Sequence, residues 1–278
     1  MTLFRTAGVG ARARLLLVGV LAGFLFFAAR ADAAITIGSG LTSTPTTGLS
    51  STSITVTQTV PQGRSFASPV DGAVVLWRWM NPLGGSARAR VLRPFNGGAL
   101  FAGVGAGPVS TSPSPGVVPF TLTPPLLIRA GDYFGVDQLS NGAISFSNAV
   151  SPATREAHWS PALVDAAGPA PPLGTSNLEL LVNADVEPAT ISLTGTPKAK
   201  IKTRKRKVLV TFTFSSNMPG LGFQCTRDTG PPSPCESPFS YAARLGSHTF
   251  KVQAADRVGP FGPSASFPFR VKRKKHRH

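Results

Sequence analysis

Glycine and proline recur so often in this sequence that long helices cannot form between them. The chain has 278 residues, of which 29 are glycine and 26 are proline, and both residue types interrupt helices and favour turns. Outside the extreme N-terminus, no segment repeats apolar residues at the helical spacing of i, i+3, i+4 and i+7. Many short strands joined by turns fit this pattern. An all-β fold is therefore predicted.

The extreme N-terminus has the features of a secretory signal peptide. Arg5, Arg12 and Arg14 precede an apolar run over residues 15–29, and Ala31-Asp32-Ala33 follows it. A small-x-small tripeptide after an apolar run is typical of a signal-peptidase site. The run is shorter than the ~20 residues that span a bilayer, so an uncleaved anchor is the weaker alternative. We expect residues 1–33 to be removed, and the mature protein to be secreted, extracellular or associated with the cell envelope, without a membrane span.

The segment over residues 34–187 predicts one domain with many strands. Its strongest strand covers residues 73–80, where Ala73, Val75, Trp77 and Trp79 would share one face by alternation. Further candidate strands, such as residues 53–60 and 87–92, are separated by glycine and proline turns. We predict a jelly-roll-like β-sandwich for residues 34–187. Residues 151–176 contain five prolines and little alternation, which favours a long surface loop.

Candidate ligand-binding residues in this first domain lie within the predicted loop. Glu156, His158 and Trp159 bring a carboxylate, an imidazole and an aromatic ring together, but no Gly-x-Ser-x-Gly motif accompanies them. Trp77 and Trp79 could form a platform for a sugar, although two tryptophans on a central strand are more typical of a core. A carbohydrate-binding module, or a secreted hydrolase with its site in this domain, is therefore the alternative function. No catalytic residue, metal site or cofactor is predicted.

The two cysteines of the chain predict a stapled hairpin. Cys225 and Cys235 are separated by an aspartate, a glycine and three prolines, which favour a turn between two strands. We hypothesise that these cysteines form a disulfide, which implies an oxidising compartment. Apolar residues also alternate with polar ones in the flanking segments, as they do on the inward faces of a sandwich.

Several motifs in the last third of the chain resemble bacterial immunoglobulin-like repeat domains of secreted and surface proteins. The motifs are Val210-Thr-Phe-Thr-Phe-Ser-Ser216, Phe223-Gln-Cys225, Cys235-Glu-Ser-Pro238, Gly246-Ser-His-Thr-Phe-Lys-Val252 and Ala254-Ala-Asp256. The resemblance implies an immunoglobulin-like β-sandwich over residues 188–269, followed by a basic tail over residues 270–278. The stretch from Pro69 to Val136 also resembles domains of uncharacterised secreted bacterial proteins, but that resemblance implies no activity.

Positive charge is concentrated in the second domain. Residues 34–187 hold seven arginines against eight acidic residues, whereas the chain from residue 188 onward holds seventeen basic residues against three acidic ones. Alternation would place five of the cations on one face of an extended segment. The candidate polyanion-binding residues are Lys198, Lys200, Lys202, Arg204, Arg206, Arg270, Lys272, Arg273, Lys274, Lys275 and Arg277.

Two interpretations of these basic runs remain open. They could contact anionic cell-envelope polymers or glycans, or they could be solvated strand ends that keep sheet edges from pairing. Nucleic acid is not expected as a partner of an exported protein. The sequence thus predicts an exported, non-enzymatic two-domain β protein with a structural or adhesive role at the cell envelope.

Overall fold

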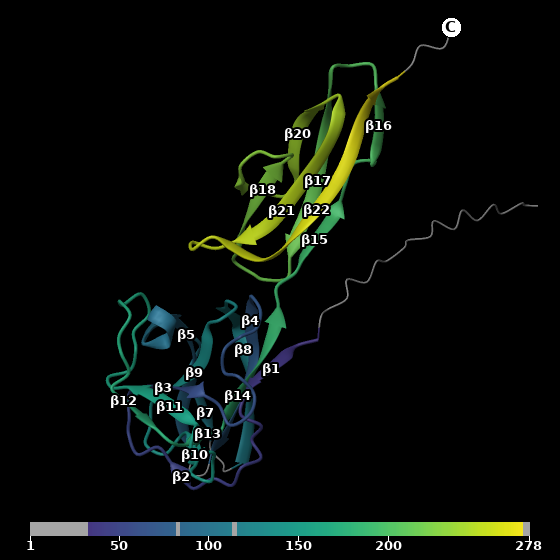
Figure 1. The fold of residues 1–278 in the computed structure, drawn as a ribbon. Coiled ribbons are helices and arrows are strands. Elements are labelled where there is room, and N and C mark those ends of the chain that lie inside the picture. The colour runs from purple at the N-terminus through teal and green to yellow at the C-terminus, as the bar shows by residue number, and fades with distance from the viewer. Residues whose placement is uncertain (1–32, 82–83, 113–115, 275–278) are drawn as a thin grey trace, which may run out of the picture. The chain divides into compact units, whose positions relative to one another are not determined.

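The computed structural model describes residues 33–81, 84–112 and 116–274 (Figure 1). Residues 1–32 of the predicted signal peptide lie outside the described residues, as do Lys275 and Arg277. The described chain is all-β, with one short 3-10 turn, η1, at Asn96–Gly98. No helix within the described ranges is long and apolar enough to cross a membrane.

Strands β1 to β14 pair only with one another, and we call them the first sandwich. One sheet has the order β1-β14-β4-β8, a second has the order β12-β11-β3-β9-β5-β6 with β7 beside β5, and a small sheet has the order β13-β10-β2. The bounds are β1 Ile35–Gly38, β2 Thr47–Gly48, β3 Ile54–Val60, β4 Gly72–Asn81, β5 Gly85–Phe95, β6 Leu100–Ala106, β7 Ser110–Ser112, β8 Gly116–Ile128, β9 Tyr133–Gln138, β10 Ser145–Ser147, β11 Arg155–Trp159, β12 Gly174–Ser176, β13 Glu179–Leu180 and β14 Val182–Pro188.

The core of the first sandwich lies between its two larger sheets. Trp77 and Trp79 on β4 are fully buried, and their ring centroids lie 4.5 Å apart. Phe134 on β9 packs against Trp77 from the opposite sheet, with 6.3 Å between ring centroids. The prediction that both tryptophans belong to the core is therefore confirmed.

A β-bulge changes the predicted facing of β4. The pairing with β14 steps from Leu76 opposite Asp185 to Val74 opposite Val186, so Val75 is the extra residue. Because the bulge shifts the alternation by one, Val74 rather than Val75 joins the core cluster that contains Trp77. The expectation that Ala73, Val75 and the tryptophans share one face was wrong for this reason.

The predicted surface loop over residues 151–176 was also wrong in part, because it contains two strands. β11 pairs with β3 and with β12, and this places Trp159 within a sheet. The segment after β11 is tied down by a buried cation. Arg90 on β5, only 1% exposed, forms ion pairs with Asp137 on β9 and with Asp165, and it also donates to the Leu163 carbonyl.

Strands β15 to β22 form the second sandwich. A three-stranded sheet has the order β15-β17-β20, and a five-stranded sheet has the order β16-β22-β21-β18-β19. The first extended segment is divided between the sheets, because β15 pairs with β17 while β16 runs parallel to β22. The bounds are β15 Ile191–Gly195, β16 Lys200–Thr203, β17 Lys207–Ser216, β18 Gly222–Arg227, β19 Ser233–Cys235, β20 Phe239–Arg244, β21 Gly246–Ala255 and β22 Pro260–Arg273.

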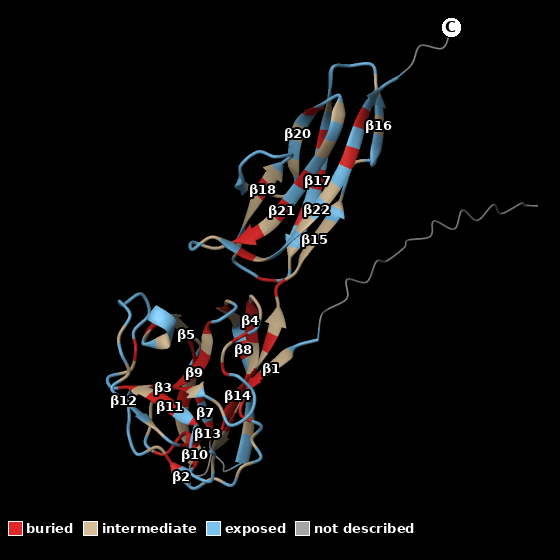
Figure 2. Ribbon diagram, in the orientation of Figure 1, coloured by how far each residue is buried: buried red, intermediate tan, exposed pale blue. Residues whose placement is uncertain are grey.

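Alternation along the strands fills the second core with phenylalanine. Val210, Phe212 and Phe214 on β17 are buried, while the residues between them are exposed (Figure 2). The Phe212 ring stacks on Phe250 of β21 with 4.0 Å between ring centroids, which joins the two sheets. The predicted inward faces of this immunoglobulin-like sandwich are thus confirmed.

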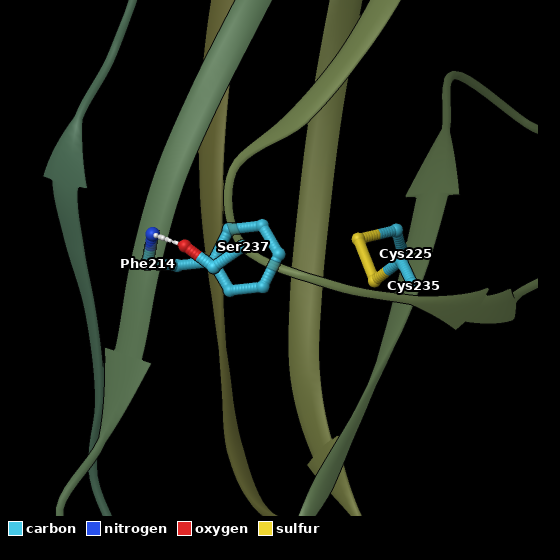
Figure 3. Close-up of a disulfide and its surroundings, with 4 residues drawn as sticks. All are labelled: Phe214, Cys225, Cys235 and Ser237. Atoms are coloured by element: carbon cyan, nitrogen blue, oxygen red, sulfur yellow. Dashed lines mark hydrogen bonds between the residues drawn. A yellow bond between two sulfur atoms is a disulfide. The ribbon is translucent and has the colours of Figure 1, made fainter.

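The disulfide between Cys225 and Cys235 joins neighbouring strands of the same sheet (Figure 3). The Cα atoms lie 5.8 Å apart, which is within the range that a disulfide spans. Cys225 is buried in the phenylalanine core. Two residues beyond Cys235, the Ser237 hydroxyl accepts a hydrogen bond of 2.9 Å from Phe214 N–H on β17. The hairpin is therefore fastened to both sheets.

The predicted tail does not begin at residue 270. Strand β22 continues to Arg273, and Val271 is 2% exposed in the core of the second sandwich. Because β16 pairs with this last part of β22, the residues from Arg270 to Arg273 belong to the sheet.

Candidate functional site

Two parallel strands place like charges side by side on the second sandwich. Lys200 on β16 pairs with Arg270 on β22, and Lys202 pairs with Lys272. All four side chains are exposed. Like charges next to one another on neighbouring strands destabilise a sheet. The folded state therefore gains no stability from this arrangement. We call Lys200, Lys202, Arg270 and Lys272 the basic ladder, and each paired couple a rung.

Apolar residues between the cations hold the ladder in place. Ile201 and Val271 are register partners; Val271 belongs to the core cluster and the half-buried Ile201 packs against it, so the alternating cations must point away from the core. Backbone hydrogen bonds of 2.8 Å from Arg270 N–H to the Ala199 carbonyl, and of 2.9 Å from Lys274 N–H to the Thr203 carbonyl, extend the pairing at both ends. The orientation of the ladder thus follows from core packing.

The other predicted polyanion-binding residues that the structure describes lie near the ends of the two ladder strands without joining the ladder. Strand β16 ends at Thr203, so Arg204 and Arg206 lie in the bend before β17, and Lys198 precedes the strand. The expected alternation of five cations was therefore wrong beyond Lys200 and Lys202. Arg273 and Lys274 are exposed at the end of β22.

In contrast, four arginines of the first sandwich form ion pairs within it, namely Arg78, Arg88, Arg90 and Arg93. Arg78 meets Asp185 at 2.7 Å, and Arg93 meets Asp132 at 2.7 Å. The hydrogen bonds from Arg78 hold the pKa of Asp185 below its ordinary value. Within the described residues, no ladder side chain has an acidic partner. The ladder therefore presents charge that the fold leaves uncompensated.

An open groove of about 680 Å³ lies beside one rung. Lys200 and Arg270 line one part of it, and Asp228 and Thr229 line another. Between them, the residues whose side chains point outward from β21 and β22 are Ser247, Thr249 and Pro268. The groove thus combines cations, hydroxyl groups, a proline ring and a carboxylate.

A histidine fixes the carboxylate at the edge of the groove. His248 Nδ1 lies 2.9 Å from Asp228 Oδ2, and Nε2 lies 2.9 Å from the Arg244 carbonyl oxygen. Two acceptors facing both ring nitrogens favour the doubly protonated imidazolium. Burial works against ionisation, but the hydrogen bonds outweigh it: they raise the pKa of His248 and lower the pKa of Asp228.

The predicted ligand-binding residues of the first sandwich are divided between two faces of β11. Glu156 is 2% exposed and hydrogen-bonds His158 Nδ1 at 3.1 Å. Both residues line a pocket of about 270 Å³. Burial raises the pKa of Glu156, although the interaction with His158 works in the opposite direction.

Trp159 points to the other face of β11. It is 3% exposed, its ring packs edge-on against Phe101 at 5.4 Å, and its indole N–H donates to the Ala170 carbonyl. Strand alternation explains why Trp159 does not share the pocket of Glu156. The three predicted residues therefore do not form one site.

No family model matches this sequence, and no curated protein matches it. Solved structures similar to it include fibronectin(III)-like modules of CbhA from Clostridium thermocellum, at 16% identity and a TM-score of 0.25, over 80% of this chain and 98% of theirs. β-Glucuronidases from an uncultured Clostridium sp. and from Lactobacillus rhamnosus match at 11% and 12% identity, both with a TM-score of 0.21. They are matched over 72% and 82% of this chain, but over 32% and 36% of their own lengths. TM-scores of this size support no transfer of activity.

Sequence reasoning missed the groove, although it found the cations. In the sequence, Asp228 and Thr229 lie in the predicted turn between the two cysteines, and Ser247 lies in the motif Gly246-Ser-His-Thr-Phe-Lys-Val252. The register that brings them beside Lys200 and Arg270 depends on the parallel pairing of β16 with β22. No cluster of three or more potential metal ligands occurs among the described residues.

Proposed function

We propose that this protein is exported and non-enzymatic, and that its second sandwich attaches it to anionic polymers of the cell envelope. Its role would be structural or adhesive. The observation that carries this proposal is the basic ladder, because its like charges are adjacent, exposed and without acidic partners in the described part of the chain. The disulfide supports an oxidising compartment. The proposed organisation is a signal peptide over residues 1–33, a jelly-roll-like domain to residue 187 and an immunoglobulin-like domain beyond it.

The like charges of the basic ladder oppose folding but favour the binding of a polyanion. A rung of two like charges on adjacent strands is destabilising. An anionic polymer lying over the ladder would reverse this repulsion, because one negative group could interact with two cations. Exposed charges are screened by salt, with a Debye length that falls from ~10 Å at 0.1 M to ~3 Å at 1 M. Attachment through the ladder should therefore be lost at high salt.

The test measures binding of the mature chain to dextran sulfate, with uncharged dextran as the neutral polymer. The variant Lys202→Gln/Lys272→Gln removes the rung outside the groove. Arg64→Gln/Arg257→Gln is the matched control, because it removes two exposed cations that lie outside the ladder. Removing the rung should weaken binding at least fivefold at about 0.1 M salt, where the Debye length is ~10 Å, while the control variant binds normally.

The stability of the same variant separates binding from folding. The rung variant should be as stable as the natural protein, or slightly more stable, because a repulsion has been removed. Equal binding by the rung variant and the natural chain would refute the proposal, as would binding that about 1 M salt leaves unchanged. Truncation at residue 269 is a poorer test, because it would also remove buried Val271.

The pocket of Glu156 and His158 supports a second candidate function, a carbohydrate-binding or hydrolytic site. The specific observation is a buried carboxylate that holds an imidazole at the edge of a small pocket. Gly174 allows the imidazole to lie there, since a Cβ atom at that position would be 3.1 Å from His158 Nε2. Glycan-array binding or ester hydrolysis that disappears in Gly174→Val, but persists in the rung variant, would support this candidate.

A further inference from the structure

The groove beside the Lys200–Arg270 rung contains more than positive charge. Two cations line one part, and hydroxyl groups of Ser247, Thr249 and Thr229 are distributed along the rest. A site for anions alone would need only the cations. The hydroxyl groups offer both donors and acceptors, which suit a ligand that carries hydroxyl groups of its own.

Asp228 makes the groove selective among polyanions. Its side chain is 45% exposed, so its oxygens remain accessible although Thr249 N–H and His248 already donate to them. Each carboxylate oxygen has a second lone pair that can accept another hydrogen bond. At a pH at which His248 is neutral, the ionised Asp228 carboxylate accepts from ligand hydroxyl groups but repels a second negative charge, whereas a protonated His248 balances that charge. A chain that carries an anionic group at every contact is therefore disfavoured at this end of the groove.

We propose that this groove binds an acidic polysaccharide whose units carry both an anionic group and free hydroxyl groups. This inference rests on the proposed attachment through the ladder and names the polymer class. The anionic group would lie between Lys200 and Arg270, and neighbouring hydroxyl groups would reach Asp228 and the threonines. Pro268 presents an exposed ring between these two ends, against which the apolar face of a sugar can pack.

The geometry of the sheet supports an extended ligand. Successive outward residues on one strand are about 7 Å apart, and neighbouring strands are ~4.8 Å apart. The line from Lys200 through Arg270 and Ser247 crosses three strands, β16, β22 and β21, and Asp228 follows beside Thr249. A polymer crossing the strands would therefore meet cations first and the carboxylate last.

The experiment compares polygalacturonate with poly-glutamate of matched length and charge, using the full mature chain. Both polymers carry carboxylates, but only the first carries hydroxyl groups. At about 0.1 M salt, where the Debye length is ~10 Å, polygalacturonate should bind at least fivefold more tightly. Lys200→Gln/Arg270→Gln should weaken binding of both polymers.

Two further variants remove the selectivity without removing the cations. Thr229→Val/Thr249→Val keeps the shape and deletes two exposed hydroxyl groups, so it should weaken polygalacturonate binding alone. Asp228→Asn should strengthen poly-glutamate binding at a pH at which His248 is neutral, because a repulsive charge is then gone. Asparagine also tolerates the positive φ of 54° at this position, so the turn should keep its conformation.

The outcomes separate this inference from the proposed function. If the natural chain binds both polymers equally and the threonine variant changes neither, the polysaccharide inference is wrong. Ladder-dependent binding to dextran sulfate would then still support attachment to polyanions. If the chain binds neither these polymers nor dextran sulfate at low salt, the proposed function fails as well.

Discussion

Replacing Trp77 by alanine tests the assignment of the first core. Trp77 is fully buried, and its ring lies within 6.3 Å of three other aromatic rings, those of Trp79, Phe120 and Phe134. A buried tryptophan removes ~150–250 Å² from solvent. Because strands from both sheets surround it, the cavity could close only partly. We expect the free energy of unfolding to fall by about 3–5 kcal/mol.

Trp77→Phe is the matched smaller change. The Trp77 indole N–H is buried and has no hydrogen-bond partner in the described structure. Phenylalanine would remove this unsatisfied donor, which costs roughly 1–3 kcal/mol when buried, while losing less volume than alanine. The loss of stability should therefore be clearly smaller for Trp77→Phe than for Trp77→Ala.

Tryptophan fluorescence during denaturant unfolding provides the measurement. The chain has 3 tryptophans, at positions 77, 79 and 159, so the signal reports on the first sandwich. The remaining two would still report after the substitution. An unchanged midpoint for Trp77→Ala, together with loss of glycan binding, would show that this face is a binding platform and refute the core assignment.

Three other changes test the remaining structural features. Arg90→Met should cost about 3 kcal/mol in unfolding experiments, because it leaves the buried Asp137 carboxylate with Arg88 as its remaining ion-pair partner; no loss would mean that the ion pair is unimportant. Replacing both cysteines by serine should cost about 2–3 kcal/mol by the chain-entropy estimate for a separation of 10 residues, and an unchanged midpoint on reduction would contradict it. His248 has its pKa raised in the folded state, so its stabilising effect is present below its unfolded pKa of ~6.5 and is lost as the pH rises through the folded value. The free energy of unfolding of His248→Gln should therefore fall less over this pH rise than that of the natural chain. Identical curves of unfolding free energy against pH for the two proteins would exclude the effect.

The sequence alone determined the fold class and much of the core. The glycine and proline content excludes long helices, and alternation selects the inward residues of a strand wherever the strand is regular. Val210, Phe212 and Phe214 were correctly assigned because β17 has no bulge among them. The disulfide followed from a short, turn-rich spacing. These properties depend on residues that are close together in the chain, so the sequence alone predicts them.

Only the tertiary structure decided the details that place the candidate site. A bulge at Val75 reversed the facing of its neighbours, because one extra residue shifts a period of two. Trp159 was predicted to lie in a loop, because the five prolines of residues 151–176 obscure the pattern of a short strand. This strand, β11, is defined by its partners β3 and β12. The basic ladder arises from the pairing of two runs about seventy residues apart in the sequence. Charge content can be counted along a chain, but which charges become neighbours depends on strand register, and register is fixed by the packing of Ile201 and Val271 into the core.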